Sequence, residues 1–348
     1  MTAAIAVFLT ACGGGGAKEV APAETSDRPA RTFLLGVSSL PADSGEDAYR
    51  DAFKLADRAG ELVLIQRAPP WSDFVPGATI SDRTERLTRL EKDLAKENNL
   101  KLFLAVDPTE PSDRGRLAGL PDDLRGKDFS DSRIRAAFIG YAKYLALNYR
   151  PAYMALGVEV DMFYDRRGDG AFRNLLSLYF EAYNAVKSVS SGTLVFPTFQ
   201  YENMLGLLHS SEGTQAAWVL VSRFEPKIDL LAVSSFPGMV FESPEAMPEF
   251  YYSALNNRTD HPIGFASIGW SSSKGAGQDS QYSFMSRTLA AADSLKASML
   301  VWYLGRDPRA QPSTAFQPLS AMGLFDADGI EKTSWSLWRR QLERPTAP

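Results

Sequence analysis

The chain has 348 residues, of which 45% are hydrophobic and 23% are charged, and its formal net charge is −5. This composition is typical of a globular protein with a large core, and the length suits one α/β barrel with insertions. The charges are spread along the chain without a basic face to meet phosphates, which argues against a nucleic-acid partner.

The N-terminus carries the only cysteine of the chain. A short apolar stretch runs into Leu9-Thr10-Ala11-Cys12-Gly13, which resembles the lipobox of bacterial lipoproteins, where the Cys becomes the lipidated first residue of the mature chain. The stretch is far below the ~20 residues that span a bilayer. We therefore expect a signal peptide over residues 1–12, a membrane anchor at Cys12, a flexible tether over 13–31 and a place in the bacterial cell envelope. Gly13 stands in place of Asp, and the resemblance to lipoprotein sorting signals therefore implies the outer membrane over the inner.

Residues 32–345 alternate short apolar runs with helical patterns, which is typical of repeated βα units. Near-continuous apolar strands indicate a parallel sheet covered by helices. Eight units favour a single-domain (β/α)8 TIM barrel, and no G-x-G-x-x-G follows an early strand, as an open dinucleotide-binding sheet would require. The predicted strands are 33–37, 62–65, 102–106, 153–156, 193–196, 230–233, 263–266 and 298–302. The predicted helices are 45–60, 82–98, 132–149, 172–189, 214–224, 244–256, 280–296 and 333–342.

The strand ends carry polar and aromatic residues. In such barrels the active site lies at the C-terminal ends of the strands. Aromatic rings there would stack on the C–H face of a sugar, and polar groups would bind its hydroxyls. Asp161, Asp165 and Asp169 lack the alternating spacing of a calcium loop, so we expect no metal and no cofactor. The candidate saccharide-binding residues are Arg67, Trp71, Asp107, Asp161, Gln200, Tyr201, Ser235, Phe236, Trp270 and Trp302.

Five short segments, 156–159, 233–237, 265–270, 301–304 and 323–329, resemble the strand ends of the retaining glycoside hydrolase clan built on this barrel. That clan includes cellulase-like and endo-β-1,4-galactanase-like enzymes, and the resemblance extends from about residue 33 to residue 338. In the clan, the acid/base Glu follows an Asn at the end of strand four, the nucleophile Glu ends strand seven, and a Trp commonly ends strand eight. The resemblance therefore implies that Glu159 is the candidate acid/base.

Two residues depart from the clan's pattern. Val158 stands where the clan has the Asn that bonds the sugar's 2-hydroxyl, and Ser267 stands at the nucleophile position. A serine hydroxyl without a base beside it is a poor nucleophile, and His261 begins strand seven, at the opposite end of the barrel. Loss of a carboxylate at such a centre removes many powers of ten in rate.

Three functions are compatible with this pattern. We favour a catalytically weakened or inactive relative that binds an oligo- or polysaccharide, with the named Trp and Tyr residues as platforms and Glu159 as a polar anchor. The second is an active glycoside hydrolase with Glu159 as general acid and either Glu202 or Asp107 as a relocated second carboxylate, because an inverting mechanism tolerates roughly 6.5–9.5 Å between the carboxyls. The third is a scaffold lipoprotein without a sugar ligand. A monomer is the default expectation.

Overall fold

The computed structural model describes residues 29–208, 215–310 and 319–347. Cys12, the signal peptide and nearly all of the tether lie outside these residues. Within the described ranges, no helix is both long enough and apolar enough to cross a membrane.

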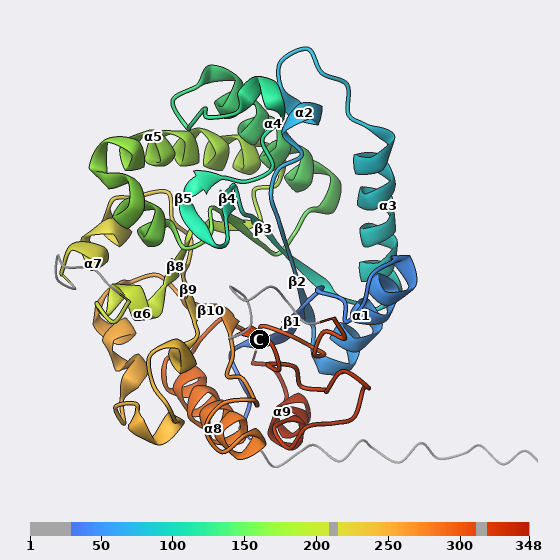
Figure 1. The fold of residues 1–348 in the computed structure, drawn as a ribbon, viewed down its shortest axis with the longest axis vertical. Coiled ribbons are helices and arrows are strands. Elements are labelled where there is room, and N and C mark those ends of the chain that lie inside the picture. Colours follow the sequence, from blue (N-terminus) through green and yellow to red (C-terminus); the bar gives the residue numbers. More distant parts are fainter. Residues whose placement is uncertain (1–28, 209–214, 311–318, 348) are drawn as a thin grey trace, which may run out of the picture.

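The predicted strands form a ring of parallel strands surrounded by helices (Figure 1). The hydrogen-bonded order is β7-β6-β3-β2-β1-β11-β10-β9-β8. Each apolar run pairs with its neighbour in the sequence, as a barrel requires. The strands are β1 (Leu34–Ser38), β2 (Leu62–Arg67), β3 (Lys101–Val106), β6 (Tyr153–Leu156), β7 (Leu194–Phe196), β8 (Thr198–Gln200), β9 (Leu231–Ser235), β10 (Ile263–Ile268) and β11 (Met299–Trp302).

The fifth strand of the barrel is split in two. Pro197 alone separates β7, which pairs with β6, from β8, which pairs with β9. Proline has no backbone N–H to give to a neighbouring strand, so the ladder is interrupted there. Because the two halves are continuous in the chain, the ring closes through them, and the (β/α)8 prediction is confirmed.

Most predicted helices are present within a few residues of their expected ends. The fourth begins much earlier than predicted, directly after Glu159, and has a kink at Gly168, where φ is 71°. The sixth, expected over 244–256, is absent as one helix. Two 3-10 helices, Pro244–Ala246 and Tyr251–Asn257, stand in its place, because Pro248 disfavours helical geometry at the residue before it. The helices are α1 (Glu46–Ala59), α2 (Trp71–Phe74), α3 (Asp82–Glu97), α4 (Ser132–Tyr149), α5 (Val160–Val189), α6 (Tyr201–Met204), α7 (Gln215–Ser222), α8 (Gln278–Ser294) and α9 (Trp335–Leu342).

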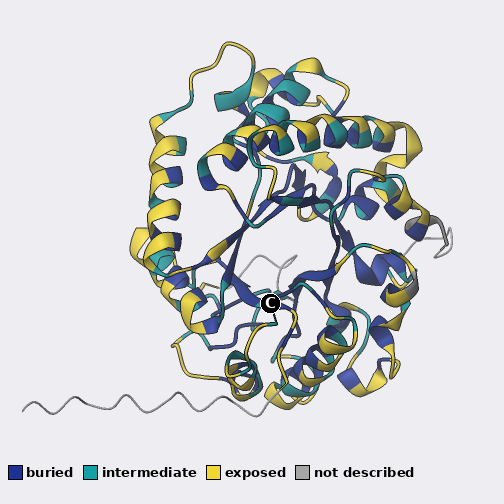
Figure 2. Ribbon diagram, turned by 180° about the vertical axis from the view of Figure 1, so that it is seen from behind, coloured by how far each residue is buried: buried dark blue, intermediate teal, exposed yellow. Residues whose placement is uncertain are grey.

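The core lies between the strands and the inner faces of the helices. Figure 2 shows the strands buried and the outer faces of the helices exposed. In α1 the buried residues are Ala52, Phe53, Ala56 and Ala59, which recur every three or four positions and so share one helix face. Burial of a side chain such as Phe53 contributes ~1.5–3 kcal/mol.

A small hairpin interrupts the barrel between β3 and α4. Its strands are β4 (Thr109–Glu110) and β5 (Asp113–Leu117), which pair antiparallel. The hairpin lies beside the mouth of the ring, next to α5 (Figure 1). It therefore places its side chains near the C-terminal ends of the strands.

Candidate functional site

A cavity of about 550 Å³ opens at the C-terminal ends of the strands. Its volume falls in the range of roughly 300–1,000 Å³ that is usual for ligand pockets. Residues from every unit of the barrel line it, which confirms that segments distant in the sequence share one mouth. Its polar and aromatic lining includes Ser38, Gln66, Arg67, Asp107, Arg114, Glu159, Gln200, Ser234, Phe236, Ser267 and Tyr303.

Glu159 lies in a constrained turn between β6 and α5. Its backbone is left-handed, with φ 52° and ψ 51°, a conformation that is uncommon for residues other than glycine and that surrounding contacts must hold. Thr198 supplies two of those contacts. Its N–H donates to the Gly157 carbonyl at 3.1 Å, and its Oγ1 accepts from the Glu159 N–H at 3.0 Å. The first residues of β8, after the proline break, thus fix the backbone of Glu159.

Arg114, on the β5 strand of the hairpin, joins the two carboxylates of the cavity. Its Nε and Nη2 donate to Glu159 Oε2 at 3.0 and 2.9 Å, and its Nη1 donates to both carboxylate oxygens of Asp107 at 2.8 Å. The side chains of Arg114, Asp107 and Glu159 are only 8%, 4% and 15% exposed. Paired charges this deeply buried interact much more strongly than exposed ones.

The pKa values of this group follow from its burial and pairing. Burial opposes the charge on Arg114, but Glu159 and Asp107 outweigh that effect and raise its pKa above the ordinary value. Burial raises the pKa of Asp107, and Arg114 offsets only part of that rise.

Sequence analysis missed Arg114. It stands in a hairpin whose only sequence signal is the turn-forming Pro111-Ser112 pair between two short polar runs.

Both carboxylate oxygens of Glu159 accept hydrogen bonds from the protein. Oε2 accepts the two from Arg114, and Oε1 accepts one from Ser234 Oγ at 2.7 Å. A general acid must present a proton to the leaving-group oxygen from one of these atoms. The contacts instead hold Glu159 as a hydrogen-bond acceptor.

Ser267 lines the same cavity and is 8% exposed. It pairs with Ser234 across β10 and β9, at a place where the strand register shifts. Ser267 and Glu159 are therefore separated in the ring by the split fifth strand and by β9, whose Ser234 bonds Glu159. His261 bonds Glu225 at 2.8 Å, at the start of β10, and is not among the residues that line the cavity.

Glu202 does not line the cavity. It is fully buried, and its carboxylate accepts hydrogen bonds from Ser235 Oγ at 2.5 Å, Tyr251 OH at 3.0 Å and the Phe236 N–H at 3.0 Å. Burial raises its pKa. The prediction that Glu202 faces the site is therefore wrong. Its carboxylate points into the protein interior toward these three donors, and two of them, Ser235 and Phe236, lie at the end of β9. Ser235 turns inward with it, and Ser234 takes the place in the lining that we expected of Ser235.

Asp161 is also buried behind the cavity wall. Its oxygens accept from the Gln200 N–H at 2.9 Å and from Asn203 Nδ2 at 3.0 Å. Burial raises its pKa to about 7. It thus connects the first turn of α5 to the end of β8 and is not among the residues that line the cavity.

The four aromatic residues expected as sugar platforms pack inside the protein and do not line the cavity. The indole N–H groups of Trp71 and Trp302 donate to the carbonyls of Ala118 and Met322 at 2.7 and 2.6 Å. Tyr201 OH donates to the Tyr251 carbonyl, and Trp270 packs on Phe284, with ring centroids 5.5 Å apart. Internal partners for the polar atoms of Trp71, Trp302 and Tyr201 make their burial favourable, whereas Trp270 Nε1 is buried without a hydrogen-bond partner among the described residues. The aromatic rings of the lining belong to Phe103, Phe236 and Tyr303.

Arg67 does line the cavity, supported from behind by Glu91. Its Nη2 donates to both oxygens of Glu91 at 2.6 Å, and Glu91 also accepts from Tyr49 OH and Tyr149 OH at 2.6 Å. The Arg67 side chain is 26% exposed. Gln200 also lines the cavity. In the described part of the chain, no group of three or more His, Cys, Asp or Glu side chains is arranged to hold a metal ion.

No protein-family model and no curated protein matches the sequence. Solved structures of similar fold include the exo-β-1,4-mannosidase Op5Man5 from Opitutaceae bacterium strain TAV5, with TM-score 0.67 and 18% identity over 89% of this chain and 59% of the mannosidase. They also include a GH5_18 protein from Bifidobacterium longum in complex with Manβ1-4GlcNAc, with TM-score 0.67 and 16% identity over 92% of this chain and 80% of that one. A family 39 glycoside hydrolase from Bacteroides cellulosilyticus has TM-score 0.60 and 14% identity, over 90% of this chain and 64% of its own. The chain spans less than two thirds of the mannosidase and of the family 39 enzyme. The chain therefore has the (β/α)8 barrel fold of these glycoside hydrolases.

Proposed function

We propose that the protein is an extracytoplasmic lipoprotein that binds a saccharide at the C-terminal ends of its barrel strands and is a weak or inactive glycosidase. The observation that carries this proposal is the guanidinium of Arg114, bonded to both carboxylates of the cavity. Glycoside hydrolysis normally needs two carboxyl groups on opposite sides of the scissile bond, one of them free to give a proton. Here the two carboxylates share one cation, and Ser267, which the sequence resemblance assigns to the nucleophile position, carries no charge.

The remaining lining supports binding. Arg67 and Gln66 offer donors, and Glu159 Oε1 accepts only one hydrogen bond from a described residue. Sugar hydroxyls need such convergent donors and acceptors. Phe236 and Tyr303, whose ring centroids are 5.3 Å apart, give the wall an apolar part for the C–H face of a sugar. The similar Bifidobacterium structure holds Manβ1-4GlcNAc, so β-linked mannosides are the first ligands to test.

An active hydrolase is the alternative, with Glu159 and Asp107 as its two carboxylates. Both line the cavity, and in this alternative Glu159 is the general acid and Asp107 is the second carboxylate. Glu202 leaves this alternative because it is not part of the cavity wall.

Calorimetry and hydrolysis assays with one panel of β-linked oligosaccharides test these functions. We expect binding without turnover in the wild-type protein. We expect weaker binding in Glu159→Gln, since this substitution removes the charge that pairs with Arg114 and so weakens the hydrogen bonds made by the anchor residue. Hydrolysis by the wild type that Glu159→Gln abolishes would establish the active enzyme instead. No heat with any sugar would favour the scaffold lipoprotein. Turnover gained by Ser267→Glu would support descent from a retaining enzyme.

The lipid anchor is tested separately. We expect a membrane-bound, acylated protein in bacterial cells, shown by labelling with a fatty acid, and a released, unlabelled protein when Cys12 is changed to Ser. Equal membrane binding by both forms would contradict the anchor.

A further inference from the structure

A second hollow of about 500 Å³ begins beside the cavity and runs along α1, from Asp47 in its first turn to Arg58 in its last. It is bounded by α1 with the loop that precedes it and by the segment that follows β11. Leu40, in the loop after β1, lines both hollows, so the two adjoin. Its side chain is 44% exposed. Leu40 therefore lies at the protein surface where the two hollows meet.

We propose that the two hollows form one groove for an extended saccharide, and that the second hollow binds uncharged sugar units of the chain held at Glu159. This inference rests on the proposed function. Active-site grooves of such barrels are built from the loops at this end of the strands, and the second hollow is bounded by the loops of the first and eighth units. Its volume again falls within the usual range for ligand pockets, roughly 300–1,000 Å³.

The charges of the second hollow suit a neutral ligand rich in hydroxyl groups. Each hydroxyl both donates and accepts, so it can bond to side chains of either sign. A strongly anionic ligand would meet three carboxylates, and a cationic one would meet four basic groups. The charged lining residues are Asp43, Asp47, Asp51, Lys54, Arg58, Arg306 and Arg309.

Two of these side chains keep bonding capacity for a ligand. Asp47 is exposed and makes no hydrogen bond or ion pair with any described residue. Arg309 is 57% exposed. Its Nη1 lies 3.9 Å from Asp43, and its Nε donates to the Ala327 carbonyl at 3.4 Å. The second hollow thus presents one free acceptor and a guanidinium with N–H donors to spare.

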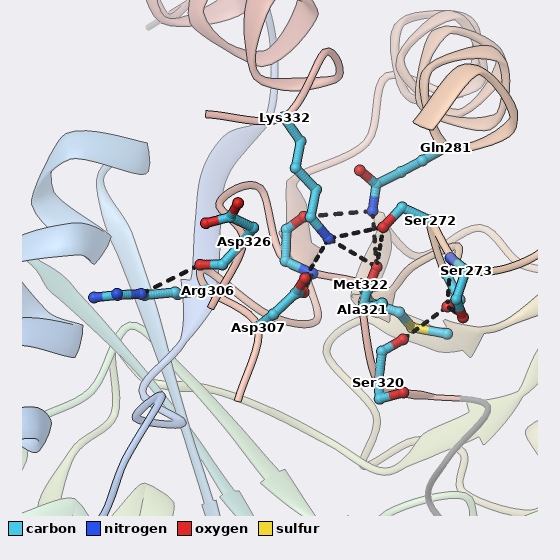
Figure 3. A network of polar contacts seen from close by, with 12 residues as sticks. Ser272, Ser273, Gln281, Arg306, Asp307, Ser320, Ala321, Met322, Asp326 and Lys332 are labelled. Atoms are coloured by element: carbon cyan, nitrogen blue, oxygen red, sulfur yellow. Dashed lines mark hydrogen bonds and ion pairs between the residues drawn. The ribbon is translucent and has the colours of Figure 1, made fainter. Parts of the chain in front are cut away.

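The wall that carries Arg306 is held in place by the polar network of Figure 3. Arg306 Nε and Nη2 donate to the carbonyls of Asp326 and Ala327 at 3.3 and 2.6 Å. Close by, buried Lys332 pairs with Asp307 at 2.5 Å and donates to Ser272 Oγ at 2.9 Å. This network connects the segment after β11 to the loop after β10. A wall fixed in advance loses little conformational freedom when a ligand binds.

Calorimetry with β-1,4-linked manno-, gluco-, galacto- and xylo-oligosaccharides of two to six units tests the groove. For the series that binds, we expect affinity to rise with chain length. Asp47→Asn and Arg309→Ala should each weaken binding of the longest ligand about two- to tenfold, the effect of one hydrogen bond, and leave the disaccharide unchanged. Asp57→Asn is the matched control, because Asp57 is exposed on the same helix as Asp47 and does not line the hollow.

The outcomes separate the groove from the proposed function. A dissociation constant that stays flat from two to six units, with the disaccharide bound, overturns the groove alone. So does an equal effect of Asp47→Asn on the shortest and longest ligands. Absence of binding at every length in all four series counts against saccharide binding itself, and the groove falls with it.

Discussion

Replacement of Arg114 by Met should destabilise the protein by ~3–5 kcal/mol, the usual effect of removing one partner of a buried ion pair. The side chains of Asp107 and Glu159 are only 4% and 15% exposed, so water compensates only in part for the lost guanidinium. Arg116→Met is the control, because Arg116 lies on the same strand and is exposed. A surface change of this kind stays within about 0.5 kcal/mol. Urea unfolding of both variants at pH 7.5 measures the difference.

The loss should also depend on pH, through Asp107. Burial already raises the pKa of Asp107, and without Arg114 it rises further. A carboxyl whose folded pKa exceeds its unfolded value of ~3.9 destabilises the folded state above the folded pKa, and this penalty fades as pH falls toward the unfolded value. The stability gap between Arg114→Met and wild type should therefore narrow from pH 7.5 to pH 4.5. A difference in unfolding free energy below about 1 kcal/mol at pH 7.5 would refute the interpretation that Arg114 neutralises buried Asp107 and Glu159. A difference that does not narrow between pH 7.5 and pH 4.5 would refute it as well.

Three further predictions concern the frame around the cavity. Burial raises the pKa of Asp161 to about 7 from an ordinary 3.8. The free energy of unfolding should therefore fall by ~1–4 kcal/mol as pH rises from about 4 to 7, and Asp161→Asn should flatten that slope in unfolding curves. Glu202→Gln places an amide N–H₂ among donors and should destabilise the fold by ~1–3 kcal/mol, while calorimetry on the folded variant shows unchanged sugar binding. Lys332→Met leaves buried Asp307 unpaired and should lower the unfolding free energy by ~3 kcal/mol or more; a neutral effect in urea would contradict the role of this pair.

The barrel could be predicted from sequence because its signals are local and repeated. Eight apolar runs alternate with helical patterns, and a parallel sheet buries such runs on both faces. The same topology predicts which residues lie at the strand ends. It therefore predicts that Glu159 and Ser267 lie in one cavity, as they do. The one predicted helix that is absent contains Pro248, whose restriction of the preceding residue overrides the helical pattern.

The orientation of individual side chains could not be predicted in the same way. Trp71 and Trp302 stand at strand ends, but whether an indole faces a cavity or the core depends on which carbonyl lies within reach of its N–H. Glu202 turns inward because Ser235, Tyr251 and the Phe236 N–H converge on it from other parts of the chain. Arg114 was missed for the same reason, since its two partners come from the ends of separate strands.

The interruption at Pro197 couples the sheet to the polar centre of the molecule. Thr198, the first residue after the break, bonds the Gly157 carbonyl and the Glu159 N–H, so the neighbouring strand helps to fix the backbone that carries the Glu159 carboxylate. Substitutions along this strand, even those with no exposed atom, are therefore expected to alter ligand selectivity before they alter folding.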